Sequence, residues 1–383
     1  MVDARTEVAI VGSGPAGGQA ARLLSGQGLQ VSLLEMRRRV GDPVQCGEAI
    51  SGTALRENAL QPDGWVRSHV KGVAAHVQGV GPARLSAPGY CIDRGAFDRS
   101  LVAMATSRGA ELQTGCHVSR VRPRRESILL ETSRGELEAE YAIAADGPWS
   151  PTARSLGLIE GWRCNVGLQY KFPAGAVDVD RDWLHLFLRE RYGGGYAWIF
   201  PRGVEVSVGV DVGRSPQSHL SSLCRDWGIR IEERQETNGG RIPARLRLRR
   251  LGVGNILVAG DAAGATNPIF GGGIHAALAT GRLAAQAILD TRENGGKPAA
   301  ARYEVSARAS PFYRSSLSEF ARMLASRTDE ELALAVKVYR RRGQPGRLVR
   351  LLPELLRQPG FLHRTFRLPR FKEALEITAR YGW

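Results

Sequence analysis

The segment that most constrains the fold is residues 8–35, VAIVGSGPAGGQAARLLSGQGLQVSLLE. A β-branched run leads into a glycine-rich stretch, an Ala- and Leu-rich helical pattern follows, and a second apolar run ends in an acid. This order predicts a strand, a tight turn, a helix and a second strand. In such a unit Gly12 permits the turn, Gly14 lets the backbone approach a pyrophosphate, and Gly17 lets the helix pack on the strand. The helix N-terminus adds N–H groups and a positive dipole end, so the segment predicts a dinucleotide site with Ala16 among its contacts.

The acid at the end of the second apolar run supports the same prediction. Glu35 stands 18 residues after Gly17, where a carboxylate accepts hydrogen bonds from the hydroxyls of an adenosine ribose. A glycine-rich turn alone is weak support, because such turns recur for purely structural reasons. Here the preceding strand, the following helix and the spacing of the acid agree, and together they favour a dinucleotide site over a bare glycine turn.

Length and composition indicate a globular protein with more than one domain. The chain has 383 residues, of which 43% are hydrophobic, and this is enough for a sizeable core and for two or three domains. The N-terminus is polar, and no stretch offers the about 18 uninterrupted apolar residues of a membrane span, so the sequence predicts a cytoplasmic protein. Five cysteines without a CxxC pair argue against a disulfide framework and a structural zinc, and we expect no metal site.

Positive charge is concentrated near the C-terminus. The net charge is +15, and residues 297–383 hold 18 Lys and Arg against 8 Asp and Glu. Arginines there are mixed with Leu and Phe, as in a segment that lies at a membrane interface. A soluble helical cap with solvated arginines is the alternative. We expect peripheral contact with the inner face of the membrane and no nucleic-acid partner.

Hydrophobic spacing divides the rest of the chain. It predicts a helix between residues 92 and 109, a sheet over 163–212, a helix over 219–227, a strand over 229–236 and a helix over 274–289. The predicted fold class is α/β. The expected domains are a discontinuous Rossmann-type domain over 1–72, 91–162 and 243–295, an inserted, mainly antiparallel β domain for the substrate over 73–90 and 163–242, and a basic helical region over 296–383.

Three separated segments have the same arrangement, a glycine-containing motif directly after a predicted strand. The N-terminal glycine-rich unit, Asp146-Gly147 and Gly260-Asp261 each follow a predicted strand. On these motifs nearly all of the chain before the basic region resembles the p-hydroxybenzoate hydroxylase-like flavoproteins, in which all three belong to one FAD-binding domain. The resemblance implies FAD as the cofactor, a hydrogen bond from a ribityl hydroxyl to Asp261, and Arg94 beside the phosphates and the ribityl chain. A helix N-cap for Asp261 and a surface charge for Arg94 are the alternatives.

A second glycine-rich loop, in GGGIHAAL, also suits a flavin. A helix that begins near Gly273 aims its N–H groups and its dipole at whatever lies in front, and an anionic reduced flavin is the kind of charge it favours. The bare glycines also let a ring and a thin substrate approach the backbone. Beyond those named above, the candidate FAD contacts are Cys46, Gly47, Pro268, Gly271, Gly272, Gly273 and Ile274.

Three further motifs narrow the resemblance. GDPVQCGEAIS, GGGYAWIFP and GDAAGATNPIFGGGIHAAL resemble the Pro-x-x-Cys-Gly-Glu, Tyr-x-Trp-x-Phe-Pro and Gly-Asp-Ala-Ala-Gly segments of the geranylgeranyl reductase family, in order. Members reduce isolated double bonds in polyprenyl chains. The resemblance therefore implies reduction of C=C bonds in a prenyl lipid or an isoprenoid quinone, with electrons from NADPH, ferredoxin or another carrier. The lipid, the number of bonds reduced and the donor stay open.

This chemistry requires an acid, because an isolated alkene has no carbonyl group to receive electrons when the flavin delivers hydride. Cys46, on a loop beside the cofactor, is the candidate proton donor, with Glu48 two residues further on. Tyr196, Trp198 and Phe200 alternate along one strand, so their rings share a face that tolerates positive charge. The candidate catalytic residues are Cys46, Glu48, Tyr196 and Trp198. The alternatives are a Cys46 thiol that gates the flavin without donating protons, loop packing for Cys46, backbone capping for Glu48, and an ordinary sheet core for the aromatic residues.

Two other functions suit a related fold. The first is an FAD-dependent monooxygenase or halogenase that acts on an aromatic or other small molecule. YAWIFP is an imperfect match to the halogenase Trp-x-Trp-x-Ile-Pro motif, and Lys71 is the only lysine near a suitable place. The second is a prenyl-protein carrier without redox chemistry, like the GDP dissociation inhibitors. Glu35 and Gly260-Asp261, which suit bound FAD, argue against the carrier.

Overall fold

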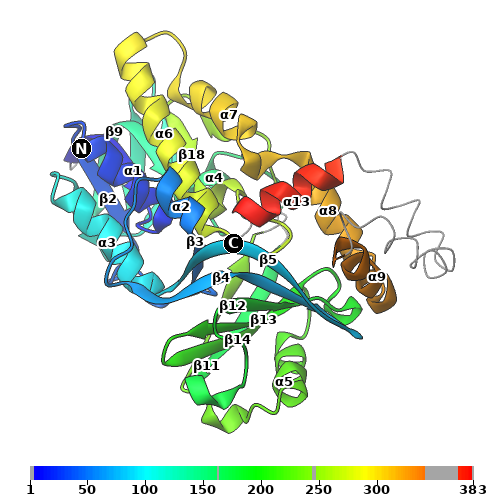
Figure 1. Ribbon diagram of the computed structural model, residues 1–383. Helices are drawn as coiled ribbons and strands as arrows, with labels where there is room; N and C mark the ends of the chain where they lie inside the picture. The colour runs from blue at the N-terminus through cyan, green and yellow to red at the C-terminus, as the bar shows by residue number, and fades with distance from the viewer. Residues whose placement is uncertain (1–3, 162–163, 244–246, 341–369, 382–383) are drawn as a thin grey trace.

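The structure, a computed structural model, describes residues 4–161, 164–243, 247–340 and 370–381. Two large sheets form its framework, and in Figure 1 the second lies below the first. The first sheet carries the N-terminal strand–helix–strand unit, and the second is mainly antiparallel. The predicted α/β fold class is confirmed.

The first sheet is parallel at its centre. β1 (Ala4–Val11) pairs in parallel with β2 (Val31–Glu35) on one side and with β9 (Gly135–Ala144) on the other. Its central side chains are fully buried and apolar, as in a sheet with both faces covered. The strand order is β17-β18-β9-β1-β2-β6, with β6 at Glu111–Thr114, β17 at Gly252–Val253 and β18 at Ile256–Val258, and the hairpin of β7 (Val118–Pro123) and β8 (Ile128–Thr132) pairs with β9.

Two helices rich in small residues pack on each other over this sheet. α1 (Pro15–Ser25) follows β1, and α6 (Ile274–Asn294) crosses α1 closely. A Cβ on Gly281 of α6 would lie 2.2 Å from the carbonyl oxygen of Ala16, so only glycine allows this approach. α3 (Arg94–Thr106) also contacts α1. The helix predicted to begin near Gly273 is confirmed, since Gly273 is the N-cap of α6.

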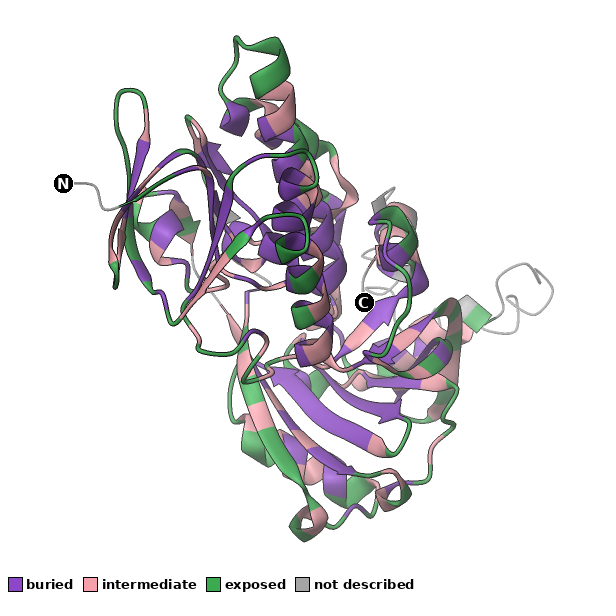
Figure 2. Cartoon of the chain, turned by 90° about the vertical axis from the view of Figure 1, so that its left-hand side faces the viewer, coloured by how far each residue is buried: buried purple, intermediate pink, exposed green. Residues whose placement is uncertain are grey.

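The second sheet has one face toward a helix and the other toward the first sheet. α5 (Pro216–Asp226) covers the outer face, where Phe172, Val206 and Val208 are buried with Leu220 and Leu223 of the helix. The strands at the centre of this sheet, over Trp183–Phe187, Tyr196–Arg202 and Glu205–Val212, are almost entirely buried, whereas the edge strand over Glu236–Ile242 has no buried residue (Figure 2). Their order is β15-β11-β14-β13-β12-β4-β5-β3, and their bounds are β3 Ala49–Ser51, β4 Val66–Val77, β5 Val80–Ile92, β11 Asn165–Pro173, β12 Trp183–Phe187, β13 Tyr196–Arg202, β14 Glu205–Val212 and β15 Glu236–Ile242.

One strand prediction was wrong. Residues 229–236 were expected to form a strand, but Ile231–Glu233 forms a 3₁₀ turn and β15 begins at Glu236. The charged residues of the turn offer no apolar face to a sheet. The strand forms where glycine allows close pairing with β11, because a Cβ on Gly239 would lie 2.6 Å from the carbonyl oxygen of Gly167. The helix expected over 219–227 begins earlier, with Pro216 in its first turn.

Four described helices follow α6. α7 (Ala299–Ala309) packs on α6, α8 (Ser315–Ala325) packs on α13 (Arg370–Tyr381), and α9 (Asp329–Arg340) lies against β4 and β5. In the part of the chain that the structure describes, no helix has both the length and the apolar composition needed to cross a bilayer. Most of the basic segment predicted to contact a membrane, residues 341–369, lies outside the described residues.

The last helix is held against α6 and α2 (Gly52–Glu57) by a cluster around a buried histidine. His275 is 1% exposed, its Nε2 lies 3.2 Å from Glu57 Oε2, and Arg380 Nη2 lies 3.0 Å from Glu57 Oε1. The ring of His275 also contacts the ring of Tyr381. Burial lowers the pKa of His275 to about 4, with Glu57 acting in the opposite direction and Arg282 and Arg380 in the same direction.

Stability should therefore fall in mild acid through His275. Its pKa is near 6.5 in the unfolded chain and about 4 in the fold, so the unfolded state binds the proton first. The neutral His275 ring contributes fully to stability above pH 6.5. As the pH falls through 4 this contribution is lost, and the total loss in the free energy of unfolding is about 3 kcal/mol. Urea unfolding across this range should show a shallower pH dependence in His275→Gln than in the wild type. The control His117→Gln, at an exposed position, should keep the wild-type slope.

Candidate active site

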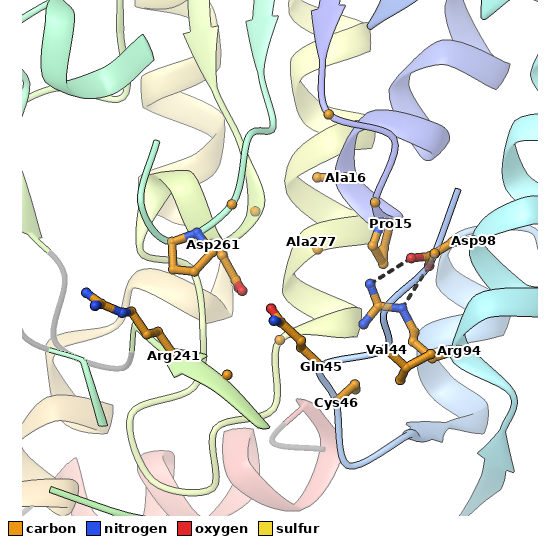
Figure 3. A pocket seen from close by; sticks show the side chains of 18 of the residues that line it. Pro15, Ala16, Val44, Gln45, Cys46, Arg94, Asp98, Arg241, Asp261 and Ala277 are labelled. Carbon is orange, nitrogen blue, oxygen red and sulfur yellow. Dashed lines mark hydrogen bonds and ion pairs between the residues drawn. The ribbon is translucent and has the colours of Figure 1, made fainter. Parts of the chain in front are cut away.

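A cavity lies between the edge of the first sheet and the inner face of the second (Figure 3). Four predicted site residues, Gly17, Glu48, Pro268 and Gly272, are not among the described residues that line it. The predicted residues that do line it are Gly12, Gly14, Ala16, Glu35, Cys46, Gly47, Arg94, Asp146, Gly147, Tyr196, Trp198, Phe200, Gly260, Asp261, Gly271, Gly273 and Ile274.

The three N-terminal glycines have three different surroundings. Gly12 has a φ of +96°, and a Cβ there would lie 2.3 Å from the carbonyl oxygen of Ala145. A Cβ on Gly17 would lie 1.9 Å from the carbonyl oxygen of Gly12, so only glycine at position 17 lets α1 lie this close to the turn after β1. A Cβ on Gly14 would meet only an Arg94 guanidinium nitrogen, at 4.0 Å, and would protrude into the cavity. The loop therefore leaves room beside Gly14 for a ligand that approaches the backbone.

Glu35 joins the end of β2 to this loop. The N–H and Oγ–H of Ser13 donate to Glu35 Oε2 at 3.0 and 2.6 Å, and the N–H of Arg37 donates to Oε1 at 2.9 Å. A carboxylate has about four acceptor positions, so Glu35 retains capacity for a ligand hydroxyl. Met36 and Arg37 line the same end of the cavity.

A buried ion pair stands on the opposite wall of the cavity from Asp261. Arg94 binds Asp98 through two hydrogen bonds, Nε to Oδ1 at 2.8 Å and Nη2 to Oδ2 at 3.0 Å (Figure 3). Burial raises the pKa of Asp98, and the carboxylate of Asp98 raises that of Arg94 against the effect of burial. The Arg94 side chain also interacts with the thiol of Cys46. The Arg94 side chain is 19% exposed and pairs with a buried carboxylate, which does not fit the alternative of a solvated surface charge.

The Cys46 thiol is held as a neutral acid. Burial raises its pKa, while Arg94 and the N–H of Glu48, which donates to Sγ at 3.2 Å, act in the opposite direction. The carbonyl oxygen of Cys46 accepts a hydrogen bond from Gln169 Nε2 at 2.8 Å. Burial therefore favours the protonated thiol, whereas the Arg94 guanidinium favours the thiolate.

Two predicted aspartates differ in how their carboxylates are used. Asp146 accepts from Ser150 Oγ at 2.6 Å and from the N–H of Thr152 at 3.0 Å, so it caps the start of α4 (Pro151–Ser155). Asp261 Oδ1 accepts from Thr266 Oγ1 at 2.7 Å, and burial raises the Asp261 pKa. Both line the cavity. The turn after β9 thus depends on Asp146 for its shape, whereas Asp261 stands at the wall with one oxygen outside that bond.

The carboxylate of Glu48 is buried behind the Cys46 loop. Glu48 is 1% exposed and has a φ of +63°, a left-handed conformation that costs energy for a side chain other than glycine. Glu48 Oε2 lies 2.9 Å from Arg202 Nη1 and 3.2 Å from Lys171 Nζ, both on the second sheet, and Oε1 accepts from the N–H of Arg94 at 3.1 Å. Glu48 is not among the described residues that line the cavity, and its contacts fix the loop to the sheet. Its part in the reaction stays a prediction.

Removing the Glu48 charge should cost much of the stability of the protein. Glu48→Gln replaces the buried carboxylate by an amide and leaves Lys171 paired with Glu236 and Arg202 paired with Glu205. Because hydrogen bonds to a buried charged group are lost, we expect a loss of about 2 kcal/mol in the free energy of unfolding. The matched control is Asp182→Asn, whose partner is Lys71 in an exposed pair, and it should cost less than about 1 kcal/mol. Urea unfolding of both variants tests this. Equal stability of Glu48→Gln and wild type would contradict the clamping role.

The three predicted aromatic residues share one wall. The Trp198 ring lies between those of Tyr196 and Phe200, at centroid distances of 5.6 and 6.0 Å. It packs over Gly209, where a Cβ would lie 2.3 Å from the indole ring. The Tyr196 hydroxyl donates to the carbonyl oxygen of Phe270 at 2.5 Å, and burial raises its pKa far above the usual value. Tyr196 therefore anchors the loop before α6 and offers its ring, rather than its proton, to the cavity.

Several contributing residues lie outside the sequence prediction. Asp98 was detectable, since it stands four residues after Arg94 on a helix, the spacing of an ion pair. No local pattern indicated three further residues, Gln169 and Lys171 on β11 and Arg202 on β13. Their partners are Cys46 and Glu48, more than a hundred residues away in the sequence.

The site fits a dinucleotide cofactor of the FAD type. Gly14 leaves the backbone open, the N-termini of α1 and α6 line the cavity, and Glu35 lines it as well. These are the donors and acceptors that a pyrophosphate and a ribose require.

Comparison with known proteins gives a consistent result. A family model described as an FAD binding domain matches residues 5–45. Digeranylgeranylglycerophospholipid reductase 1 of Methanopyrus kandleri is 32% identical over 311 residues, which cover 75% of this chain and 81% of the relative. A geranylgeranyl bacteriochlorophyll reductase-like protein from Thermoplasma acidophilum has a TM-score of 0.79 at 24% identity, covering 91% of this chain and 99% of that one. The flavin-dependent halogenase CmlS has a TM-score of 0.65 at 21% identity, covering 87% and 64%; these two likenesses concern the fold.

Proposed function

The chain belongs to the geranylgeranyl reductase family of FAD-dependent oxidoreductases, and from this premise we propose that it saturates isolated C=C bonds in the polyprenyl chains of a lipid. The relatives are named for a digeranylgeranylglycerophospholipid, and we extend that substrate class to this chain. An isoprenoid quinone is the other prenyl carrier that the site suits. The proposal rests on the placement of the Cys46 thiol, which lines the same cavity as the glycine-rich loop and the aromatic wall of the second sheet.

The cofactor residues follow from the cavity wall. FAD, when bound, supplies the hydride. We assign Gly12, Gly14 and the N-terminus of α1 to its phosphates, Glu35 to its adenosine ribose and Asp261 to its ribityl chain. The N-terminus of α6, at Gly273 and Ile274, would favour negative charge on the ring system.

The chain's own acid completes the reaction. When hydride adds to one alkene carbon, the other carbon must receive a proton, and we assign that proton to Cys46 Sγ. The thiolate left behind is stabilised by the Arg94 guanidinium that already interacts with it. The rings of Tyr196, Trp198 and Phe200 stabilise positive character on the alkene during the transfer, since a cation is attracted to an aromatic face.

The electron donor and the membrane contact belong to the proposal as well. NADPH or ferredoxin would reduce the flavin, and peripheral contact with the inner face of the membrane would bring a prenyl lipid to the cavity. The excess of arginine in residues 297–383 supports that contact.

The halogenase alternative has less support at the site. Lys71, the lysine that it invoked, is not among the described residues that line the cavity. Its Nζ lies 2.5 Å from Asp182 Oδ2, and its side chain is 68% exposed.

Anaerobic turnover with a lipid mixture tests the proposal. The FAD-loaded protein is reduced with dithionite and mixed with an extract of geranylgeranyl-bearing lipids, and the products are analysed by mass spectrometry. We expect a ladder of masses, each step heavier by two hydrogens, in one lipid class. An unchanged lipid profile, with flavin reoxidised only after air is admitted, would favour a monooxygenase or halogenase.

A further inference from the structure

The ring of an exposed tryptophan beside the cavity contacts two arginine side chains. Trp149 is 51% exposed and follows the Asp146-Gly147 turn. The Cζ of Arg154, from α4, lies 4.0 Å from the centroid of its ring, and the Cζ of Arg241, from β15, lies 5.1 Å from it. We call these three residues the Trp149 cluster. It joins the turn after β9 to the edge strand of the second sheet.

The Trp149 cluster stands at one side of the cavity. Arg241 and Pro148, the neighbour of Trp149, both line it. In Figure 3, Arg241 lies on the same side as Asp261, and the Arg94–Asp98 pair lies on the opposite side. The nearby carboxylate of Asp146 is held by Ser150 and Thr152 in the turn. Arg241 therefore adds positive charge to the cavity wall, whereas Arg154 is not among the described residues that line the cavity and stands beside it against the Trp149 ring.

The geometry of the cluster suits a phosphate group. Stacking on an indole uses the flat face of a guanidinium, and its five N–H donors lie in the plane of the group. One of them, Arg154 Nε, donates to the carbonyl oxygen of Trp149 at 2.8 Å and holds this side chain beside the ring. Two guanidinium groups ordered on one ring lose less side-chain entropy on binding than two mobile lysines would. Arginine forks match phosphate oxygens in pairs, and such charge-assisted hydrogen bonds are among the strongest in proteins.

We infer that the Trp149 cluster binds a phosphate group at the edge of the cavity. Two molecules in the proposed reaction carry one: the head group of a prenyl phospholipid and the pyrophosphate of a dinucleotide electron donor. The inference for the lipid rests on the proposed function, whereas phosphate binding by the cluster does not. Exposed Trp149 adds an apolar surface next to the charge, as a ligand with a polar and an apolar part requires.

Calorimetric titration of the FAD-loaded protein with inorganic pyrophosphate tests the site without turnover. We expect Arg154→Gln/Arg241→Gln to bind roughly tenfold more weakly than the wild type or worse. Trp149→Ala, which keeps both charges but loses the stacking, should bind with intermediate affinity. The control Arg120→Gln/Arg225→Gln removes the same charge from two exposed positions elsewhere and should bind as the wild type does. Equal affinity in all four proteins, or no binding by the wild type, would overturn the inference.

Two kinetic measurements then separate the sources of the phosphate. If it belongs to the lipid, the double variant should raise KM for digeranylgeranylglyceryl phosphate but not for the corresponding alcohol. If it belongs to the donor, the variant should raise the NADPH concentration needed for half-maximal flavin reduction. Either result supports the site. If neither value changes, pyrophosphate is an adventitious ion only and the inference fails. A protein that reduces no prenyl lipid but still loses pyrophosphate binding in the variant would refute the proposed function alone.

Discussion

Replacing Gly17 by alanine is expected to destroy the dinucleotide unit. The new Cβ would stand 1.9 Å from the carbonyl oxygen of Gly12 and 3.2 Å from Ile10 Cγ2, so β1 and α1 have to move apart. Since α1 also packs on α6 and α3, the shift spreads through the core around the first sheet. We expect a loss of about 3 kcal/mol or more in the free energy of unfolding and no retention of FAD on purification.

The comparison with Gly14 makes this prediction specific. Gly14→Ala meets no protein atom closer than 4.0 Å, so its melting temperature without cofactor should match that of the wild type. Its Cβ enters the cavity, however, and FAD should bind at least tenfold more weakly. Thermal unfolding of both variants checks the predicted stabilities, and FAD titration checks the predicted affinities. A Gly14→Ala protein with wild-type FAD affinity would contradict the assignment of this loop to the phosphates.

The second large effect is expected at Cys46. Cys46→Ser should retain FAD and fold normally, but its rate of prenyl reduction should fall by about a hundredfold or more, which is the usual contribution of a general acid. Serine keeps the shape of the side chain but is a much weaker acid than a thiol. The matched control is Cys164→Ala, because Cys164 is a partly exposed thiol that is not among the described residues lining the cavity.

The pH dependence distinguishes proton donation from packing. Burial raises the pKa of Cys46, and a donor acts in its protonated form. The turnover rate of the wild type should therefore stay constant through neutral pH and fall only above the ordinary thiol pKa, whereas Cys46→Ser should show no such fall. Measuring kcat from neutral to alkaline pH tests this. A Cys46→Ser variant with the wild-type rate would remove Cys46 from the chemistry.

Local sequence signals sufficed for the parts of the site that a single segment makes. Gly12, Gly14 and Gly17 lie in one turn, and Glu35 ends the next strand, so their roles follow from spacing along residues 8–35. The N-terminus of α6 at Gly273 was predictable for the same reason. Residues 229–236 misled the prediction, because the pairing of β15 depends on a close approach of backbones at Gly239, which no periodicity reports.

The parts made by contacts between distant segments were not accessible in this way. Glu48 stands next to the candidate acid in sequence, but Lys171 and Arg202 reach it from two strands of the second sheet. Only the fold shows that the Glu48 carboxylate is buried between these cations and joins the loop to the sheet. Likewise, Trp149 and Arg241 are ordinary surface residues in the sequence, and only the meeting of α4 and β15 brings them together.

Single-turnover oxidation of the reduced protein by a defined lipid directly tests whether the protein reduces prenyl C=C bonds. The FAD-loaded protein is reduced, freed of excess reductant under nitrogen, and mixed with digeranylgeranylglyceryl phosphate in detergent while the flavin absorbance is followed. We expect the oxidised flavin spectrum to return without oxygen, with one double bond saturated per flavin oxidised, and we expect Cys46→Ser to slow this step. A flavin that stays reduced in the presence of the lipid and is reoxidised only in air would contradict prenyl reduction by this protein.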